Sequence, residues 1–86
     1  MESSRMDDVS IPIDQIYVPA KRRAEIDSAR VDALAESILE EGLKVPISVR
    51  AGKGRYVLVA GLQRLEAMRA LGEKTITAIV VGSPQH

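Results

Sequence analysis

The segment of this chain best suited to chemistry is a glycine at the start of a predicted helix that has a side-chain amide and a cation in its first turn. The apolar run 57–60 leads into Gly61, and a helix-type pattern with Gln63 and Arg64 in its first turn follows. Such a turn gathers unpaired backbone amides, the positive end of a helix dipole and a guanidinium in one small space. That space suits an anion, most often a phosphate. The predicted phosphate-binding residues are therefore Gly61, Leu62, Gln63 and Arg64.

These residues also have simpler explanations, which the sequence leaves open. Gly61 could serve only to make a tight turn, and Arg64 could pair with Glu66 on the surface of the helix. Two further arginines, Arg22 and Arg23, could lie in a solvated loop.

Composition excludes several classes of chemistry. The 86 residues contain no Cys, and the one His is the last residue, His86. Disulfides, thiol catalysis, a histidine-based triad and a histidine or cysteine metal site are therefore excluded, and no metal site is predicted. No apolar run approaches the roughly 20 residues that span a bilayer. Residues 1–10 lack the apolar stretch of a signal peptide. We expect a cytoplasmic protein without a membrane partner.

The net charge of zero conceals a separation of charge along the chain. Residues 24–41 hold six acidic residues and one arginine, whereas residues 44–72 hold six basic residues and one glutamate. Two interpretations remain open: one face attracts anions and another repels them, or the acidic and basic elements neutralise each other in the fold.

Hydrophobic periodicity predicts one small α+β (small α/β) domain over residues 9–82, between a disordered leader (1–8) and a tail (83–86). About four strands form a mixed sheet with two helices, in the order β-α-β-β-α-β. The expected strands are 9–13, with Pro12 suited to a sheet edge, then 45–49, 55–59 and 75–81. The expected helices are 27–41 and 62–71. Residues 14–19 are expected to be a turn and an extended piece, and 20–24 a basic loop.

The first predicted helix has recognisable ends and one apolar face. Asp27 or Ser28 is its expected N-cap, and Gly42 its C-cap. Its apolar stripe consists of Val31, Leu34, Ile38 and Leu39.

Three segments, in order, resemble the N-terminal domain of ParB partition proteins and sulfiredoxin, which shares that fold. Residues 13–16 with Arg22-Arg23 resemble the family's "PRR" segment. Residues 34–47 resemble "LAxSIxxxGLxxPI", residues 60–72 resemble "GERRxxAxxxxG", and residues 75–81 resemble the closing strand. The chain thus resembles a stand-alone domain of the ParB/sulfiredoxin superfamily.

The resemblance implies a ligand and positions for its contacts. The matching turn holds the phosphates of CTP in ParB proteins and serves ATP in sulfiredoxin, so it implies CTP or ATP with Mg²⁺ at residues 61–64. It also implies that Arg23, and Arg22 beside it, approach the same pocket from the other side. Contacts to base or sugar would come from a loop consisting of Gly42, Leu43, Lys44, Val45 and Pro46.

Departures from the family limit what it implies. Leu62 stands where sulfiredoxin has its catalytic Cys, which excludes sulfinic acid reductase chemistry. Gln63 stands where ParB has the first Arg of its pair, so one cation is missing, although an amide can still hydrogen-bond a phosphate more weakly. ParB's later acidic and Asn positions, its helix-turn-helix and its dimerisation domain have no counterpart. We expect a stand-alone regulator of the family or a fragment.

The predicted function is a module that binds a nucleotide or nucleic-acid phosphate, with a regulatory or DNA-partition-associated role. Its expected partners are nucleotide and DNA or another DNA-binding protein, and a homodimer could form through sheet edges. One alternative is a small Mg²⁺-dependent NTPase, nuclease or phosphotransferase, for which Glu41 and Glu66 are the candidate catalytic acids. Another is a protein-interaction domain whose ancestral pocket is empty.

Overall fold

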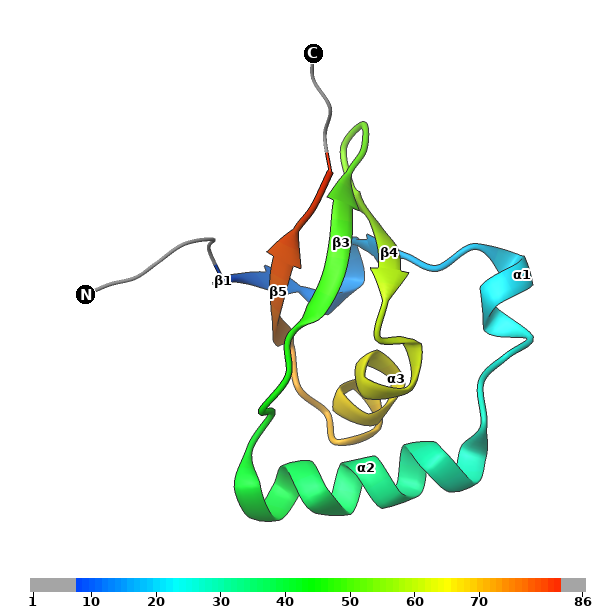
Figure 1. The fold of residues 1–86 in the computed structure, drawn as a ribbon, viewed down its shortest axis with the longest axis vertical. Coiled ribbons are helices and arrows are strands. Elements are labelled where there is room, and N and C mark those ends of the chain that lie inside the picture. Colours follow the sequence, from blue (N-terminus) through cyan, green and yellow to red (C-terminus); the bar gives the residue numbers. More distant parts are fainter. Residues whose placement is uncertain (1–7, 83–86) are drawn as a thin grey trace.

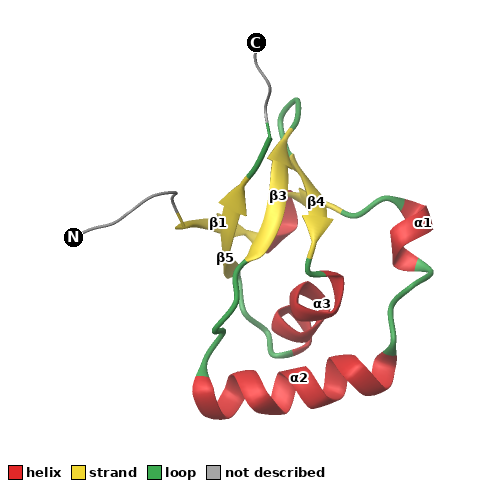
Figure 2. Cartoon of the chain, viewed as in Figure 1, coloured by secondary structure: helices red, strands yellow, loops and turns green. Residues whose placement is uncertain are grey.

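Residues 8–82 are the part of the chain that the computed structural model describes, and they form five strands, three α-helices and a 3₁₀ turn (Figure 1; Figure 2). In chain order the elements are β1 (Asp8–Pro12), the 3₁₀ turn η1 (Ile13–Gln15), β2 (Ile16–Tyr17), α1 (Ala20–Arg23), α2 (Ser28–Glu41), β3 (Ile47–Ala51), β4 (Tyr56–Ala60), α3 (Leu62–Ala70) and β5 (Thr75–Val80).

The strands form one mixed sheet in the order β1-β5-β3-β4-β2. β3 and β4 form an antiparallel hairpin, and β5 lies parallel to β3 on its other side. β1 pairs antiparallel with β5 and is an edge strand. Pro12 lies in this edge strand, where its missing amide donor costs no ladder hydrogen bond.

The helices stack outward from the sheet. α3 lies between the strands and α2, which crosses beneath it, and α1 stands apart on the right of the view (Figure 1). The core is formed by alternate residues of the strands and by one face of α3. Its fully buried side chains include Ile11, Ile47, Val49, Leu65 and Ile76.

The predicted fold class is confirmed, but the sheet has one strand more than expected and there is one helix more. Residues 16–17, expected to be merely extended, pair in parallel with β4 as the short strand β2. The predicted basic loop 20–24 is instead helical over Ala20–Arg23. The amides of Arg22 and Arg23 bond to the Pro19 carbonyl at 2.9 and 3.0 Å. Alanine, lysine and arginine all favour helix, which accounts for this turn.

Element boundaries differ from the predictions by one or two residues. β1 ends at Pro12, because Ile13 begins the 3₁₀ turn. β3 begins at Ile47 rather than at Val45, whose side chain is 53% exposed, and the intervening Pro46 has no amide to donate to a ladder. Asp27 is the N-cap of α2, as one of the two predicted caps. The predicted leader and tail fall almost wholly on 1–7 and 83–86, outside the described residues, although Asp8 belongs to β1.

The predicted apolar stripe of α2 is wrong at Leu39, whose side chain is 75% exposed. Val31 is buried, and Leu34 and Ile38 are partly buried. α2 rests on another helix instead of a broad sheet face, so the strip it covers is narrow. Leu39 is about 100° around the helix from Ile38 and therefore falls outside that strip.

Candidate functional site

The turn between β4 and α3 depends on a glycine. Gly61 is the N-cap of α3 and has φ 103° and ψ 30°, in the left-handed region that favours glycine. A Cβ built on Gly61 would lie 2.6 Å from Cγ2 of Ile47 and 2.9 Å from its Cβ. The contact that excludes a side chain here is therefore the start of β3, so Gly61 is required by packing whether or not an anion binds.

The first turn of α3 leaves backbone amides without helical partners. The first intrahelical bond from this turn runs from the Leu65 amide to the Gly61 carbonyl at 2.9 Å, and no side chain caps the helix. The amides of residues 62–64 precede any i−4 acceptor. These donors and the helix dipole present partial positive charge at the mouth of the turn.

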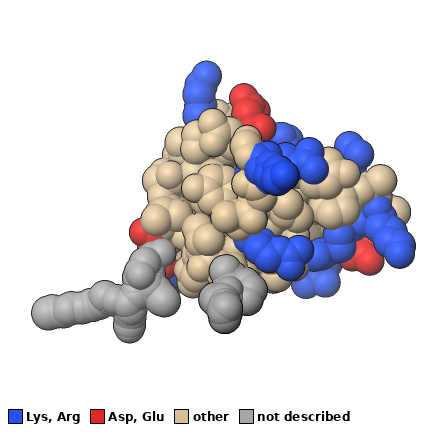
Figure 3. Space-filling view, turned by 90° about the horizontal axis from the view of Figure 1, so that it is seen from above, with Lys and Arg blue, Asp and Glu red and all other residues tan. Residues whose placement is uncertain are grey.

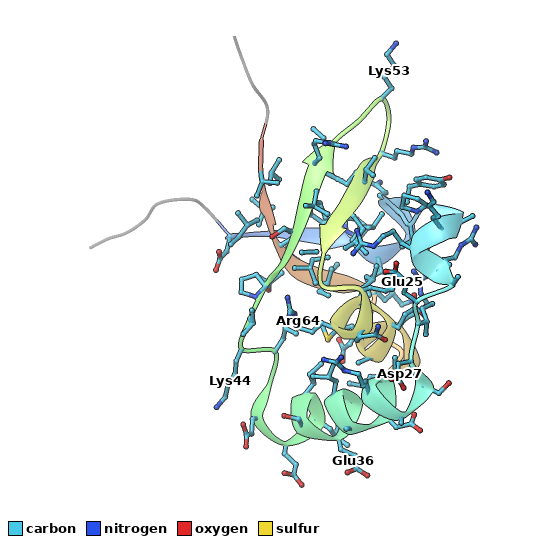
Figure 4. The ribbon with its side chains drawn as sticks, turned by 45° about the vertical axis from the view of Figure 1, so that its right-hand side comes forward. Glu25, Asp27, Glu36, Lys44, Lys53 and Arg64 are labelled. Atoms are coloured by element: carbon cyan, nitrogen blue, oxygen red, sulfur yellow. The ribbon has the colours of Figure 1, made fainter. Side chains whose placement is uncertain are left out.

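Arg64 lies with its guanidinium beside this turn. Its Nη2 is 3.2 Å from the point where a Gly61 Cβ would stand, near the start of β3. Its Nε is buried and has no hydrogen-bond partner within the described part of the chain. In Figure 4 the side chain leaves α3 on the side of the segment that joins α2 to β3. A buried charged donor without a partner is costly, so the guanidinium of Arg64 lacks an acceptor that it needs.

The space beside Arg64 is a cavity of about 530 Å³ between three helices. Its residues come from α1 and the segment after it, from the first half of α2, and from the β4–α3 turn: Arg22, Glu25, Arg30, Ala33, Leu34, Gly61, Leu62, Gln63 and Arg64. We call this cavity the α3 pocket. All four residues predicted at the turn line it, together with Arg22.

Arg22 is fixed at the rim of the α3 pocket by two contacts. Its Nη1 donates to the carbonyl of Val59 in β4 at 3.0 Å, and its Nε lies 3.5 Å from Oε1 of Glu25. Arg22 is thus tied to the strand that leads into Gly61, and it lines the same pocket as Arg64.

The side chain of Gln63 is bonded to the protein backbone and is not free to bind a phosphate. Its Nε2 donates to the carbonyl of Glu25 at 2.9 Å, and its Oε1 accepts from the amide of Asp27 at 2.9 Å. Both ends of the side-chain amide are therefore engaged by the segment that joins α1 to α2.

Two residues of the α3 pocket, Arg30 and Glu25, were missed by the sequence analysis. Both lie more than 30 residues from Arg64 in sequence. The packing of α2 on α3 brings Arg30 to the pocket, and the bond from Gln63 holds the segment that carries Glu25. One signal was available for Arg30, because it is the only cation of the acidic segment 24–41.

The remaining candidates lie outside the α3 pocket. Arg23 lines a different cavity, together with Glu66 and Arg69. The two predicted catalytic acids are each in an ion pair with a neighbouring base. Glu41 lies 3.1 Å from Nζ of Lys44, and Glu66 lies 3.5 Å from Nε of Arg69.

The loop 42–46 is also absent from the lining of the α3 pocket. Leu43 packs against the core, and Lys44 projects away from the fold in Figure 4. No group of three or more His, Cys, Asp or Glu residues within 8–82 is arranged to hold a metal ion. No helix among the described residues is long and apolar enough to cross a membrane.

With this geometry established, comparison with known proteins identifies the family. The family described as ParB N-terminal domain matches residues 1–86. The chain belongs to this family. A probable chromosome-partitioning protein ParB from Campylobacter jejuni is 44% identical over 71 residues, which are 81% of this chain and 26% of that protein. This ParB N-terminal domain thus spans about a quarter of the length of such a relative.

Solved structures confirm the fold. The crystal structure of sulfiredoxin from Arabidopsis thaliana is similar to 90% of this ParB N-terminal domain and 86% of that chain, with a TM-score of 0.80 and 34% identity. A C-terminally truncated chromosome-partitioning protein ParB from Caulobacter crescentus, complexed with CTP-gamma-S, is similar over 92% of this chain and 46% of that one. Its TM-score is 0.76 and its identity 29%.

Proposed function

We propose that this ParB N-terminal domain binds CTP or ATP, with the phosphates of the nucleotide in the α3 pocket. The observation that carries the proposal is the buried, unpartnered Nε of Arg64 beside the open amides at the start of α3. The similarity to a ParB protein complexed with CTP-gamma-S supports the same ligand class.

The cations of the α3 pocket fit a polyphosphate better than a single phosphate. Arg22, Arg30 and Arg64 approach from three different helices. Guanidinium groups form charge-assisted and often bidentate bonds with phosphate oxygens. The family motif has an arginine where this chain has Gln63. Arg30, which the motif does not include, compensates for that missing cation.

Mg²⁺ can accompany the nucleotide in this pocket. A bound Mg²⁺ commonly takes one or two carboxylates together with substrate phosphates, and it would neutralise phosphate charge. Glu25 supplies the carboxylate of the α3 pocket.

Under this proposal the role is regulatory and associated with DNA partition, as the names of the relatives suggest, with DNA or a DNA-binding protein as partner. The second candidate is the enzyme, a small NTPase, nuclease or phosphotransferase. The presence of Glu25 favours this candidate. Glu25 would be its catalytic acid in place of Glu41 or Glu66, because it alone of the three lines the α3 pocket.

Calorimetric titration with CTP and ATP, with and without Mg²⁺, tests the binding. Arg64→Ala should weaken nucleotide binding about 10- to 100-fold, because a hydrogen bond from a charged group to phosphate contributes about 1.5–3 kcal/mol. Arg69→Ala is the matched control: it removes an arginine from the same helix but outside the α3 pocket, and should change the affinity less than about twofold.

Two results would count against the proposal. Absence of binding by either nucleotide at millimolar concentration would favour the protein-interaction hypothesis. Equal losses of affinity in the two variants would remove Arg64 from the site.

A second experiment, the turnover of labelled CTP and ATP, distinguishes a binding module from an enzyme. Binding without hydrolysis supports the module, whereas hydrolysis that disappears in Glu25→Gln supports the enzyme.

A further inference from the structure

The Gln63 side chain joins two parts of the fold that are far apart in sequence. Gln63 is the second residue of α3, and its partners, the Glu25 carbonyl and the Asp27 amide, lie 38 and 36 residues earlier. One amide group therefore both donates to and accepts from the α1–α2 segment (24–27). The two partners fix its orientation, since a carbonyl can only accept and an amide N–H can only donate.

Among the described residues, few other contacts hold α1 and this segment in place. None of the residues of α1 is buried, and Ile26 is the one side chain of 24–27 that packs, partly buried, against the core. The other polar tie to the body of the fold is the bond from Arg22 to the Val59 carbonyl. Within residues 8–82, three hydrogen bonds (two to Gln63 and one from Arg22) and the apolar contact of Ile26 thus position this wall of the α3 pocket.

The segment carries the groups that complete the α3 pocket. Glu25 stands near its beginning, and Arg22 lies just before it in α1. At its end Asp27 caps α2, because its Oδ1 accepts from the amides of Ala29 at 3.1 Å and Arg30 at 3.3 Å. The bond from Asp27 to Gln63 therefore links the first turn of α3 to the first turn of α2, on which Arg30 lies.

We propose that Gln63 is a positioning residue, which presets the spacing of Arg22 and Arg30 around the α3 pocket and does not itself bind the anion. This inference rests on the proposed function and concerns how the same site is assembled. The chemistry of the side chain explains the choice of residue. Arginine has donors and no acceptor, and glutamate at neutral pH has acceptors and no donor, so neither can make both bonds. A pocket wall that is already in place need not be ordered when the anion arrives, which favours binding.

Three variants separate positioning from direct binding. Gln63→Met keeps the length of the side chain and removes both bonds. Gln63→Arg adds a cation at the pocket but cannot accept from the Asp27 amide. Gln15→Met is the matched control, because Gln15 is an exposed glutamine in η1, outside the lining of the α3 pocket.

The first measurement uses the protein without ligand. Hydrogen exchange of the Asp27 amide, followed by NMR, should accelerate about tenfold in Gln63→Met and Gln63→Arg and stay unchanged in Gln15→Met. Exchange of the Leu65 amide, which bonds to the Gly61 carbonyl, should remain as in wild type and shows that the fold is intact. Unchanged exchange at Asp27 in Gln63→Met overturns the proposal.

The second measurement titrates inorganic triphosphate. Positioning predicts that Gln63→Met and Gln63→Arg both bind several-fold more weakly than wild type, even though the arginine adds positive charge. Tighter binding by Gln63→Arg overturns the proposal, because it is the result expected of a direct ligand. Failure of wild type to bind triphosphate counts against the proposed function, and the exchange at Asp27 reports independently on the connection.

Discussion

Individual residues of the turn divide into those that shape it and those that act in it. Gly61 shapes it, because Ile47 leaves no room for a Cβ, and Leu62 anchors it with a side chain that is 5% exposed. Arg64 retains an unpartnered buried donor. Gln63 fixes a neighbouring segment. Four consecutive residues that a motif groups as phosphate-binding thus have different physical roles.

Substituting Gly61 by alanine tests the packing role directly. A Cβ at φ +103° is strained by about 1–2 kcal/mol, and the 2.6 Å contact with Ile47 adds an overpacking cost of about 1–3 kcal/mol. Gly61→Ala should therefore lower the free energy of unfolding in urea by about 2–5 kcal/mol. Gly54→Ala is the control, since φ is +71° there but no atom lies within 4 Å, and it should cost only the backbone strain. Equal costs at the two sites would show that Ile47 does not restrict the turn.

The residues that line the α3 pocket could be predicted from the sequence only where a local pattern along the chain points to them. Gly61 and Arg64 were found because a strand, a glycine and a helix follow one another along the chain. Arg30 and the partners of Gln63 were not, since their contacts arise from the packing of α2 on α3, and no spacing along the sequence encodes that.

At the scale of elements, α2 is the support of the α3 pocket. Its N-terminus is fixed by Asp27 and its C-terminus by Gly42 at φ 82°, and both positions were predicted. Its burial was predicted less well: a stripe of four apolar residues suggested a broad contact, whereas Leu39 faces solvent. Caps depend on residues adjacent in sequence, but the width of a buried face depends on the partner it meets.

Removal of the N-cap should loosen α2 without unfolding the domain. Asp27→Ala deletes the acceptor for the amides of Ala29 and Arg30 and should cost about 1 kcal/mol, or about 5 °C in Tm for a domain of this size. Asp32→Ala, at an exposed position inside the same helix, should stay within about 0.5 kcal/mol. Thermal unfolding by circular dichroism measures both, and a shift of similar size in the two variants would argue against the cap.

Across the described part of the molecule, the acidic and basic segments meet in an ion pair where they adjoin, between Glu41 and Lys44. The ion pairs described within residues 8–82 each join residues three apart in sequence, so none links the middle of acidic α2 to the basic β3–β4 hairpin. Seen from above, Lys and Arg gather over the side on which α1 lies (Figure 3). This arrangement favours the interpretation with one anion-attracting face over mutual neutralisation. Association of two copies through the sheet edges stays a prediction.

Stability of the whole domain rests on a small core, which makes single deletions severe. Leu65 is 0% exposed, and Leu65→Ala should cost about 2–5 kcal/mol, a large part of the roughly 4–13 kcal/mol expected for a domain of this length. Leu39→Ala makes the same chemical change at an exposed position and should cost less than about 0.5 kcal/mol. Chemical denaturation of the two variants measures the contrast, and a comparable loss at Leu39 would place that residue in a contact not described here.

The most direct measurement is an NMR titration of the ¹⁵N-labelled domain with CTP, with the shifts assigned residue by residue. The account predicts that the largest changes fall on the amides of residues 62–64 and on the Nε–H of Arg64, with smaller changes at Arg22 and Arg30. Changes centred on the separate cavity of Arg23 and Arg69, or none at millimolar CTP, would contradict it.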